Sequence, residues 1–278
     1  MMLTCMLALT RIFSSTAALP HAVACLRIRE EGKMSISPGE EIRNNYILSL
    51  VPEEELELFR PHVEVTQLHM GDIIEEAKQP VRFLYFPIDA AISFTGRDEN
   101  GHTVDVTVTG KDGCSGSCVA QGSETSASTA MIQVSGAALR LPAFVLKQNF
   151  DRLHFLREAL IRYNLLLLRH AVISTSCSQF HSGEQRLARW LVAHAHRTGL
   201  EAFPFSVDFL AGQVGQHRNE VDAFLKEFEK QDLVKREHNK VLLRDIAGLS
   251  KRACPCVGQA EEATEEYRKS LMQLATSR

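Results

Sequence analysis

The sequence lacks three features that would each assign it to a class. Its net charge is only −3, from 31 basic and 34 acidic residues, so the whole surface does not attract nucleic acid indiscriminately, although one domain can still carry a basic face. No segment reaches the roughly 18 uninterrupted apolar residues of a membrane-spanning helix. The seven cysteines are odd in number and scattered, which argues against the disulfide framework of a small secreted protein.

Catalytic motifs are also missing. The chain contains no nucleophile elbow, phosphate-binding loop or HExxH zinc motif. His194 and His196 lie two residues apart in AHAHRTG, and this spacing does not put both on one helix face. We therefore expect a protein that is not an enzyme, with these two histidines in core or solvent positions.

Residues 1–33 stand apart from a chain that is otherwise of globular composition, 45% hydrophobic and 23% charged. Residues 1–29 contain three arginines and no acid, which resembles a targeting peptide, and Ala-Val-Ala before Cys25 resembles a lipoprotein cleavage site. However, Arg11 splits the apolar run and no basic residue precedes it. We predict a poorly ordered extension, or an upstream start assignment, with the domain beginning at Met34.

Residues 34–149 are predicted to form a small antiparallel β-barrel or jelly roll. The segments HVEVTQL, RFLYF, AISF, TVDVTVT and AMIQV alternate or cluster β-forming residues, with turn residues between them. The barrel would run from about 62 to 141. Short helices are expected before it, in residues 38–60, with Pro38 and Pro52 at their starts.

Residues 150–181 are predicted to form one long helix. Its apolar residues recur at steps of three and four, and LLLL at 165–168 makes more than one face apolar. The barrel, a second subunit, or both must therefore cover the helix. We interpret it as a dimerisation helix, with an ordinary core helix as the alternative. The predicted dimer stripe comprises Leu153, Leu156, Leu160, Tyr163, Leu167 and Ala171.

Residues 182–252 are predicted to form a winged helix-turn-helix, followed by a helical tail over 253–278. A helix over 183–199 precedes AGQVGQHRNEVDAFLKEF, in which two amphipathic helices flank Gly215. Ser206 is a suitable N-cap for the first of them. The exposed start of the second helix is predicted to contact DNA bases, through His217, Arg218, Asn219 and Glu220. Predicted DNA backbone contacts are Ser206, Gln216 and three basic residues of a β-hairpin, Lys235, Arg236 and Lys240.

These motifs resemble the Crp/Fnr family of bacterial transcription regulators over about residues 45–260. GEQRLARWL, SVDFLAGQVGQHRNEV and KQDLVKREHNKVLLRDIAGL are closely similar to that family. The resemblance implies an α+β protein with a cyclic-nucleotide-binding-like sensor barrel and a homodimer. It also implies a cytoplasmic location and a palindromic double-stranded DNA operator, and it makes RNA polymerase a candidate partner. GLSKRACPC and FLYFPIDAAISF point to a branch without an assigned effector.

The chain also departs from the family pattern. Arg218 matches the usual base-reading arginine, but Asn219 stands where a glutamate is common and Ala223 replaces a second basic reader of the cyclic-AMP receptor branch. Glu220 and Asp222 add negative charge near DNA. We therefore expect an unfamiliar operator. A degenerate member that acts through protein contacts, or a redox or metal sensor that binds DNA weakly, is the alternative.

The barrel has no cation for a cyclic phosphate. Residues 112–139 contain neither Lys nor Arg, although a buried phosphate needs a cationic partner. Ser128 or Thr129 falls where the resemblance places the phosphate-pairing arginine, while Gly113 and Gly116 keep the tight turn. These four residues are the candidate effector pocket. We expect no tight binding of cyclic AMP or cyclic GMP there, and either a neutral ligand or none.

The cysteines do not predict a cluster. Iron–sulfur ligation usually needs four thiolates, whereas Cys114 and Cys118 lie in the barrel and Cys254 and Cys256 far along the chain. Buried or tail thiols without a metal are the preferred interpretation, and no cofactor is expected. Redox pairing of Cys254 with Cys256, and haem bound through a histidine, stay open.

Overall fold

The computed structural model describes residues 41–97, 99, 103–203, 205–237 and 240–277. The predicted extension, residues 1–33, and Pro38 lie outside these residues. Everything below belongs to one unit of the chain, residues 36–278.

Short helices precede the barrel, as predicted. They are η1 (Ile42–Asn44), α2 (Tyr46–Ser49), α3 (Glu53–Phe59) and η2 (Arg60–His62). Asn45 is fully buried and fixes this segment to the barrel: its side chain caps α2 and donates to the carbonyls of Pro87 and Gly113, both at 3.0 Å. Pro52 stands at the N-cap of α3, where its fixed φ suits a helix start.

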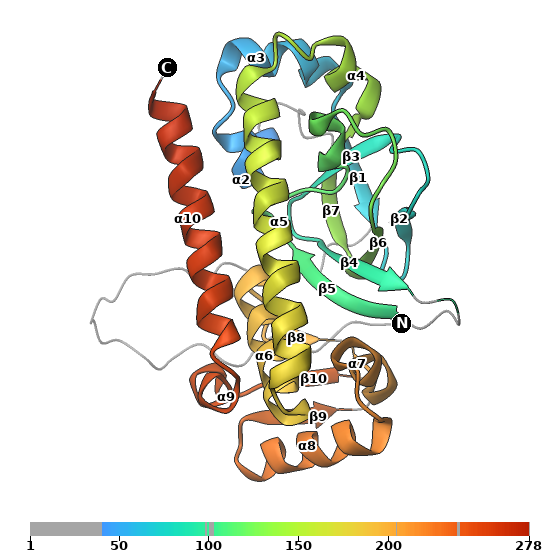
Figure 1. Cartoon of the computed structure of the whole chain (residues 1–278), viewed down its shortest axis with the longest axis vertical. Helices are drawn as coiled ribbons and strands as arrows, with labels where there is room; N and C mark the ends of the chain where they lie inside the picture. Colours follow the sequence, from blue (N-terminus) through green and yellow to red (C-terminus); the bar gives the residue numbers. More distant parts are fainter. Residues whose placement is uncertain (1–40, 98, 100–102, 204, 238–239, 278) are drawn as a thin grey trace, which may run out of the picture. The chain divides into compact units, whose positions relative to one another are not determined.

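Seven strands form the barrel as two antiparallel sheets, which confirms the α+β fold class (Figure 1). One sheet has the order β1-β7-β3 and the other β2-β6-β4-β5. The strands are β1 (Glu64–Leu68), β2 (Ile73–Glu75), β3 (Phe83–Pro87), β4 (Ala91–Arg97), β5 (Thr103–Thr109), β6 (Thr129–Val134) and β7 (Gly136–Pro142). A short helix, η3 (Ser117–Gln121), lies between β5 and β6, and α4 (Ala143–Gln148) follows β7.

The predicted long helix is α5 (His154–Phe180), and a carboxylate from another element caps its start. Glu55 of α3 accepts hydrogen bonds from the backbone N–H groups of Phe155, at 2.8 and 2.9 Å, and Leu156, at 3.2 Å. These are N–H groups that a helix leaves unpaired in its first turn, where negative charge also suits the helix dipole. Glu55 therefore fixes the direction in which α5 leaves the barrel.

The dimer stripe predicted on α5 is wrong for most of its residues. Leu153, Leu156, Leu160 and Tyr163 are at most 1% exposed in the single chain, because they belong to the same hydrophobic core as the barrel. Leu167 and Ala171 are half-buried. The large apolar side chains that α5 leaves exposed are Leu165, Leu168 and Val172, which lie on another face, and Phe180 at its end.

The predicted tail is α10 (Cys256–Thr276), and it packs along α5 (Figure 1). Ala263, Tyr267 and Leu271 join the core that α5 shares with the barrel. Ion pairs flank this contact, such as the one between Arg169 Nη1 and Glu266 Oε2 at 2.5 Å. Part of the cover that the apolar α5 requires therefore comes from its own chain.

The C-terminal domain has its own hydrophobic core around Leu191, Leu210 and Leu225. It contains α6 (Gly183–Thr198), β8 (Ala202–Phe203), α7 (Val207–Val214), α8 (Arg218–Lys230), β9 (Val234–Glu237), β10 (Lys240–Leu243) and α9 (Ile246–Arg252). The three strands form a small sheet in the order β8-β10-β9. Gly199 ends α6 in the left-handed conformation, as its position after the apolar pattern predicts.

Candidate functional site

Two helices joined by a tight turn form the reading head, which we define as α7 and α8. Ser206 caps α7 by accepting a hydrogen bond from the backbone N–H of Phe209 at 3.1 Å. Gly215 closes the turn at φ +58°, a conformation that favours glycine. Val221 and Leu225 of α8 are fully buried, so the opposite face of α8 is turned outward.

The four predicted base contacts all lie at the start of α8 and are exposed: His217, Arg218, Asn219 and Glu220. Arg218 forms an ion pair with Asp208 of α7, with Nε and Oδ1 3.0 Å apart. Both side chains are more than half exposed, so this pair is weak and can be broken at little cost. Glu220 has a second role, because its Oε2 accepts a hydrogen bond from the His217 backbone N–H at 3.1 Å and caps α8.

The β9–β10 hairpin carries the predicted backbone contacts, and one of them needs correction. Arg236 is bound to α8 through Glu229 and Asp222, both at 2.7 Å, and therefore braces the hairpin against the helix. The Asp222 charge is balanced there, and hydrogen bonds from Lys226 and Arg236 lower the pKa of its carboxyl. Lys235 pairs with Glu237 at 2.5 Å.

The remaining predicted backbone contacts stay predictions. Lys240 and Ser206 are exposed at the start of β10 and of α7. Gln216 is half-buried, and its side-chain amide donates to the carbonyl of Gly215 at 2.9 Å. The hairpin turn, residues 238–239, lies outside the described part of the chain.

The candidate effector turn of the barrel is filled by the protein itself. Gly116 has φ +75°, and its N–H donates to Glu75 Oε2 at 2.8 Å. Ser126 donates to the other carboxylate oxygen. Burial raises the pKa of Glu75, and these two hydrogen bonds partly offset the increase. A carboxylate from β2 thus already occupies the kind of backbone donor that would bind a phosphate.

The other candidate pocket residues are engaged as well. A Cβ on Gly113 would lie 2.3 Å from both Tyr163 Oη and Thr109 Oγ1, so this glycine is in close contact with its neighbours. The Ser128 carbonyl accepts from Ser126 Oγ at 2.7 Å, and Thr129 Oγ1 accepts from a backbone N–H at 3.4 Å. Glu75 carries no signal in the sequence, because only the fold brings β2 to this turn.

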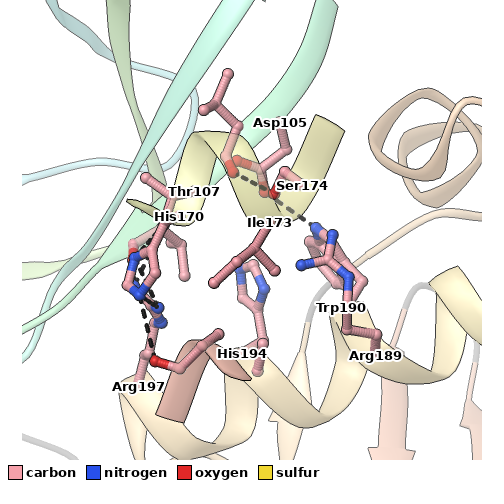
Figure 2. Close-up of a pocket in the computed structure, with 13 residues that line it drawn as sticks. Asp105, Thr107, His170, Ile173, Ser174, Arg189, Trp190, His194 and Arg197 are labelled. Atoms are coloured by element: carbon pink, nitrogen blue, oxygen red, sulfur yellow. Dashed lines mark hydrogen bonds between the residues drawn. The ribbon is translucent and has the colours of Figure 1, made fainter. Parts of the chain in front are cut away.

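A buried polar network joins the barrel to the C-terminal domain (Figure 2). Asp105 of β5 accepts hydrogen bonds from Trp190 Nε1 at 3.0 Å, Ser93 Oγ at 2.9 Å and Gln133 Nε2 at 3.3 Å. Burial raises the pKa of the Asp105 carboxyl, and these donors counteract the increase. A cavity of about 40 Å³ lies beside the network, between β5, α5 and α6.

Two histidines of this network are buried and neutral. Arg197 Nη2 lies 3.1 Å from both ring nitrogens of His170, and the His194 ring contacts Gln133 Oε1 and stacks on Trp190. Burial lowers the pKa of each histidine to about 3, and the charge of Arg197 lowers it further. Of the core and solvent positions expected for the two histidines of AHAHRTG, His194 takes the core position. His196 is half-exposed and paired with Glu261.

The fold also assembles a group of sulfur and nitrogen side chains that the sequence leaves far apart. Cys177 and His181, at the end of α5, meet Cys254 and Cys256, which lie around the start of α10. The sequence spacing signalled only the Cys-x-Cys half of this group. The other half depends on how α5 meets the C-terminal domain.

Comparison with known proteins agrees with this geometry. Residues 185–252 match the family of the Crp-like helix-turn-helix domain. Among solved structures, FixK2 from Bradyrhizobium japonicum superposes with a TM-score of 0.59 at 13% identity, over 69% of this chain and 98% of its own. A Crp/Fnr-family transcriptional regulator from Eubacterium rectale gives 0.61 at 15% identity, over 75% and 98%. No curated protein sequence matches the chain.

Residues 185–252 thus match a Crp-like helix-turn-helix domain, and the chain shares the fold of solved Crp/Fnr-type regulators. The matched domain coincides with α6–α9 and contains the whole reading head, while the shared fold extends through the barrel and α5. In the described part of the chain, no helix is both long and apolar enough to cross a membrane.

Proposed function

We propose that the chain is a DNA-binding transcription regulator of the Crp/Fnr type, a cytoplasmic homodimer that reads a palindromic operator with α8 of each subunit in the major groove. The observation that carries this proposal is the exposed start of α8 on a Crp-like domain, with Arg218 at its first position. Recognition helices contact base edges with their N-terminal residues, and arginine pairs best with guanine. Asp208 holds Arg218 at this surface through a weak pair that a guanine can replace.

The exposed apolar side chains of α5 support the dimer. Leu165, Leu168 and Val172 are each about 60% exposed and follow steps of three and four, so they form one stripe along the helix. The same stripe on a second subunit would cover it in an isologous contact. Two heads so joined would address half-sites roughly 34 Å apart, which is one turn of DNA.

The barrel would act on the heads through the buried network of Figure 2. Asp105 on β5 accepts a hydrogen bond from Trp190 on α6. A displacement of β5 would therefore move α6, the first helix of the C-terminal domain. Cyclic nucleotides are poor candidate signals, because Glu75 occupies the Gly116 N–H and would repel a phosphate. A neutral ligand, or a regulator without a ligand, fits this barrel better.

Selection of bound sequences from a random duplex pool tests the proposal. We expect an enriched palindrome with the wild-type chain, and loss of its sequence preference in the double variant Arg218→Ala/Asn219→Ala. Lys226→Ala is the matched control, because Lys226 is an exposed cation two turns further along α8. Enrichment that survives the double variant would contradict the assignment. Weak, purely salt-dependent binding without enrichment would instead favour a degenerate head that acts through protein contacts.

A further inference from the structure

The group formed by Cys177, His181, Cys254 and Cys256, which we call the Cys/His group, has the size of a site for a single metal ion. The four candidate ligand atoms all lie within 4.8 Å of one another. Cys177 Sγ and Cys254 Sγ are 3.4 Å apart, and Cys256 Sγ and His181 Nδ1 are 3.6 Å apart. Zinc–sulfur bonds of about 2.3 Å in a tetrahedron put neighbouring ligand atoms about 3.8 Å apart. The observed separations therefore need only small adjustments.

The chain places these ligands by local structure. Cys177 lies in the last turn of α5, and His181 is the C-cap residue of the same helix. Cys254 and Cys256 flank Pro255, the N-cap of α10, whose ring fixes φ at −57°. Pro255 is exposed, whereas both flanking thiols are buried, so the Cys-Pro-Cys turn directs its two sulfur atoms to the same side.

The surroundings suit thiolates bound to a cation. The three cysteines are at most 3% exposed and pack with Ile173, while the half-buried His181 leaves a route from solvent. Three thiolates and a neutral imidazole around a divalent ion would carry a net charge of −1. The guanidinium of Arg189 interacts electrostatically with Cys177 and Cys256, and so it would compensate this charge.

We propose that the Cys/His group binds one Zn²⁺ ion in a tetrahedral site of three sulfurs and one nitrogen. Binding forms three Zn–S bonds and one Zn–N bond and releases the three thiol protons to solvent, while His181 binds in its neutral form. Three cysteines and one histidine are a ligand set of structural zinc sites, with no position left for water. The group is too compact for an iron–sulfur cluster, whose several irons would spread the ligands further apart.

A disulfide accounts for less of this arrangement. A disulfide between Cys177 and Cys254 would need a bond of about 2.05 Å. It would not explain why Cys256 and His181 lie beside these two cysteines. A bond between Cys254 and Cys256 would close a strained ring. The cytoplasm also keeps thiols reduced, an argument that rests on the proposed function.

The bound ion would tie the end of α5 to the connection between α9 and α10. This point lies where α5 passes into the C-terminal domain, since α6 begins only two residues after His181 (Figure 1). The ion would therefore hold the C-terminal domain and α10 to the same helix. Its removal would loosen the attachment of the reading head without changing the head itself.

The test is the metal content of the reduced, full-length chain, measured by mass spectrometry after zinc loading and gel filtration. We expect one zinc per chain in the wild type and in Cys118→Ser, the control, because Cys118 is a half-buried thiol of the barrel. Cys254→Ser should lose the ion, and His181→Gln should bind it about 10-fold or more weakly. Circular dichroism of each variant separates loss of the site from loss of the fold.

Cobalt titration of the wild-type chain gives a readout that does not depend on any variant. One equivalent of Co²⁺ should produce tetrahedral ligand-field bands and intense thiolate-to-metal absorption, both removed by added zinc. The proposal is overturned if the reduced wild type takes up no stoichiometric metal, or if Cys254→Ser retains it. Iron accompanied by acid-labile sulfide would overturn it as well. None of these results depends on whether the reading head binds DNA.

Discussion

The reading head and the barrel use charged residues in opposite surroundings. At the start of α8 the candidate base contacts are exposed, and the pair that Arg218 forms with Asp208 is weak. In the barrel and at its junction, Glu75 and Asp105 are half-buried and His170 is buried, and all three are hydrogen-bonded and shifted in pKa. The charged residues of the reading head are therefore available to a charged partner, whereas those of the barrel are already hydrogen-bonded within the chain. Changes in the barrel should affect stability first, and changes in the head should affect DNA binding first.

The largest expected effect is the pH dependence of stability set by the junction histidines. His170 and His194 have pKa values of about 3 in the folded chain against an ordinary value of 6.5, so the unfolded chain takes up their protons first. Their stabilising contribution is complete above pH 6.5 and is lost as the pH falls. Each should cost roughly 1.4 kcal/mol of unfolding free energy per pH unit below that value. Urea unfolding at several pH values measures the slope.

His194→Gln should remove one histidine's share of that slope relative to the wild type. An identical slope in His194→Gln and the wild type would contradict the buried, neutral assignment. At lower pH the Asp105 carboxyl, whose pKa is raised, contributes to the pH dependence with the opposite sign, so the slope should be measured close to neutral pH.

A pair of glycine substitutions compares the packing of the two regions. Gly113→Ala should destabilise the protein by about 1–3 kcal/mol, because the new Cβ would lie 2.3 Å from the Tyr163 hydroxyl. Gly212→Ala in α7 should stabilise it by roughly 0.4–1 kcal/mol, because nothing lies within 4 Å and a helix favours alanine. Thermal unfolding of both variants measures the difference. Equal effects of the two changes would show that the effector turn is not filled.

Two basic residues of the hairpin should have different effects. Lys240→Ala should weaken binding to every duplex and lower the slope of log K against log salt by about 0.9, as expected when one phosphate contact is lost. Arg236→Ala should instead destabilise the C-terminal domain, because it removes the ion pairs with Asp222 and Glu229. Fluorescence anisotropy over a salt series, with unfolding curves of both variants, separates the two roles. If Lys240→Ala has the same salt dependence as the wild type, Lys240 does not contact a DNA phosphate.

The smallest expected effect is that of cyclic AMP or cyclic GMP on the melting temperature. We expect no saturable shift, because the turn offers the carboxylate of Glu75 where a phosphate needs a cation. Isothermal titration on the wild-type chain measures the same property directly. Saturable micromolar binding would show that the barrel opens to admit an anion.

The parts that sequence could predict are those encoded by neighbouring residues. Ser206, Gly215 and the apolar spacing of α8 are contiguous, so the reading head could be predicted with the correct turn and caps. The long α5 was also predictable from periodicity. The surface against which α5 packs was not predictable, because the same apolar stripe can face a partner, the barrel or α10. Only the assembled structure shows that Leu156 and Leu160 belong to the core shared with the barrel.

The unpredicted parts depend on contacts between distant segments. Glu75 meets Gly116 from another strand, and Asp105 meets Trp190 across 85 positions. The Cys/His group joins Cys177 to Cys254 across 77 positions and His181 to Cys256 across 75. Apart from the Cys-x-Cys spacing and the turn glycine, these residues carry no local signature, because their chemistry comes from burial and proximity that the fold alone creates.

The central claim is that Arg218 reads a base. It is tested most directly by the ratio of affinities for the selected palindrome and a scrambled duplex at one salt concentration. For the wild type and Lys226→Ala this ratio should be the same. In Arg218→Ala the ratio should fall, by an amount equivalent to about 1–3 kcal/mol of binding free energy per guanine contact. Binding to the scrambled duplex should change little. An unchanged ratio in Arg218→Ala, or an equal loss on both duplexes, would contradict the claim.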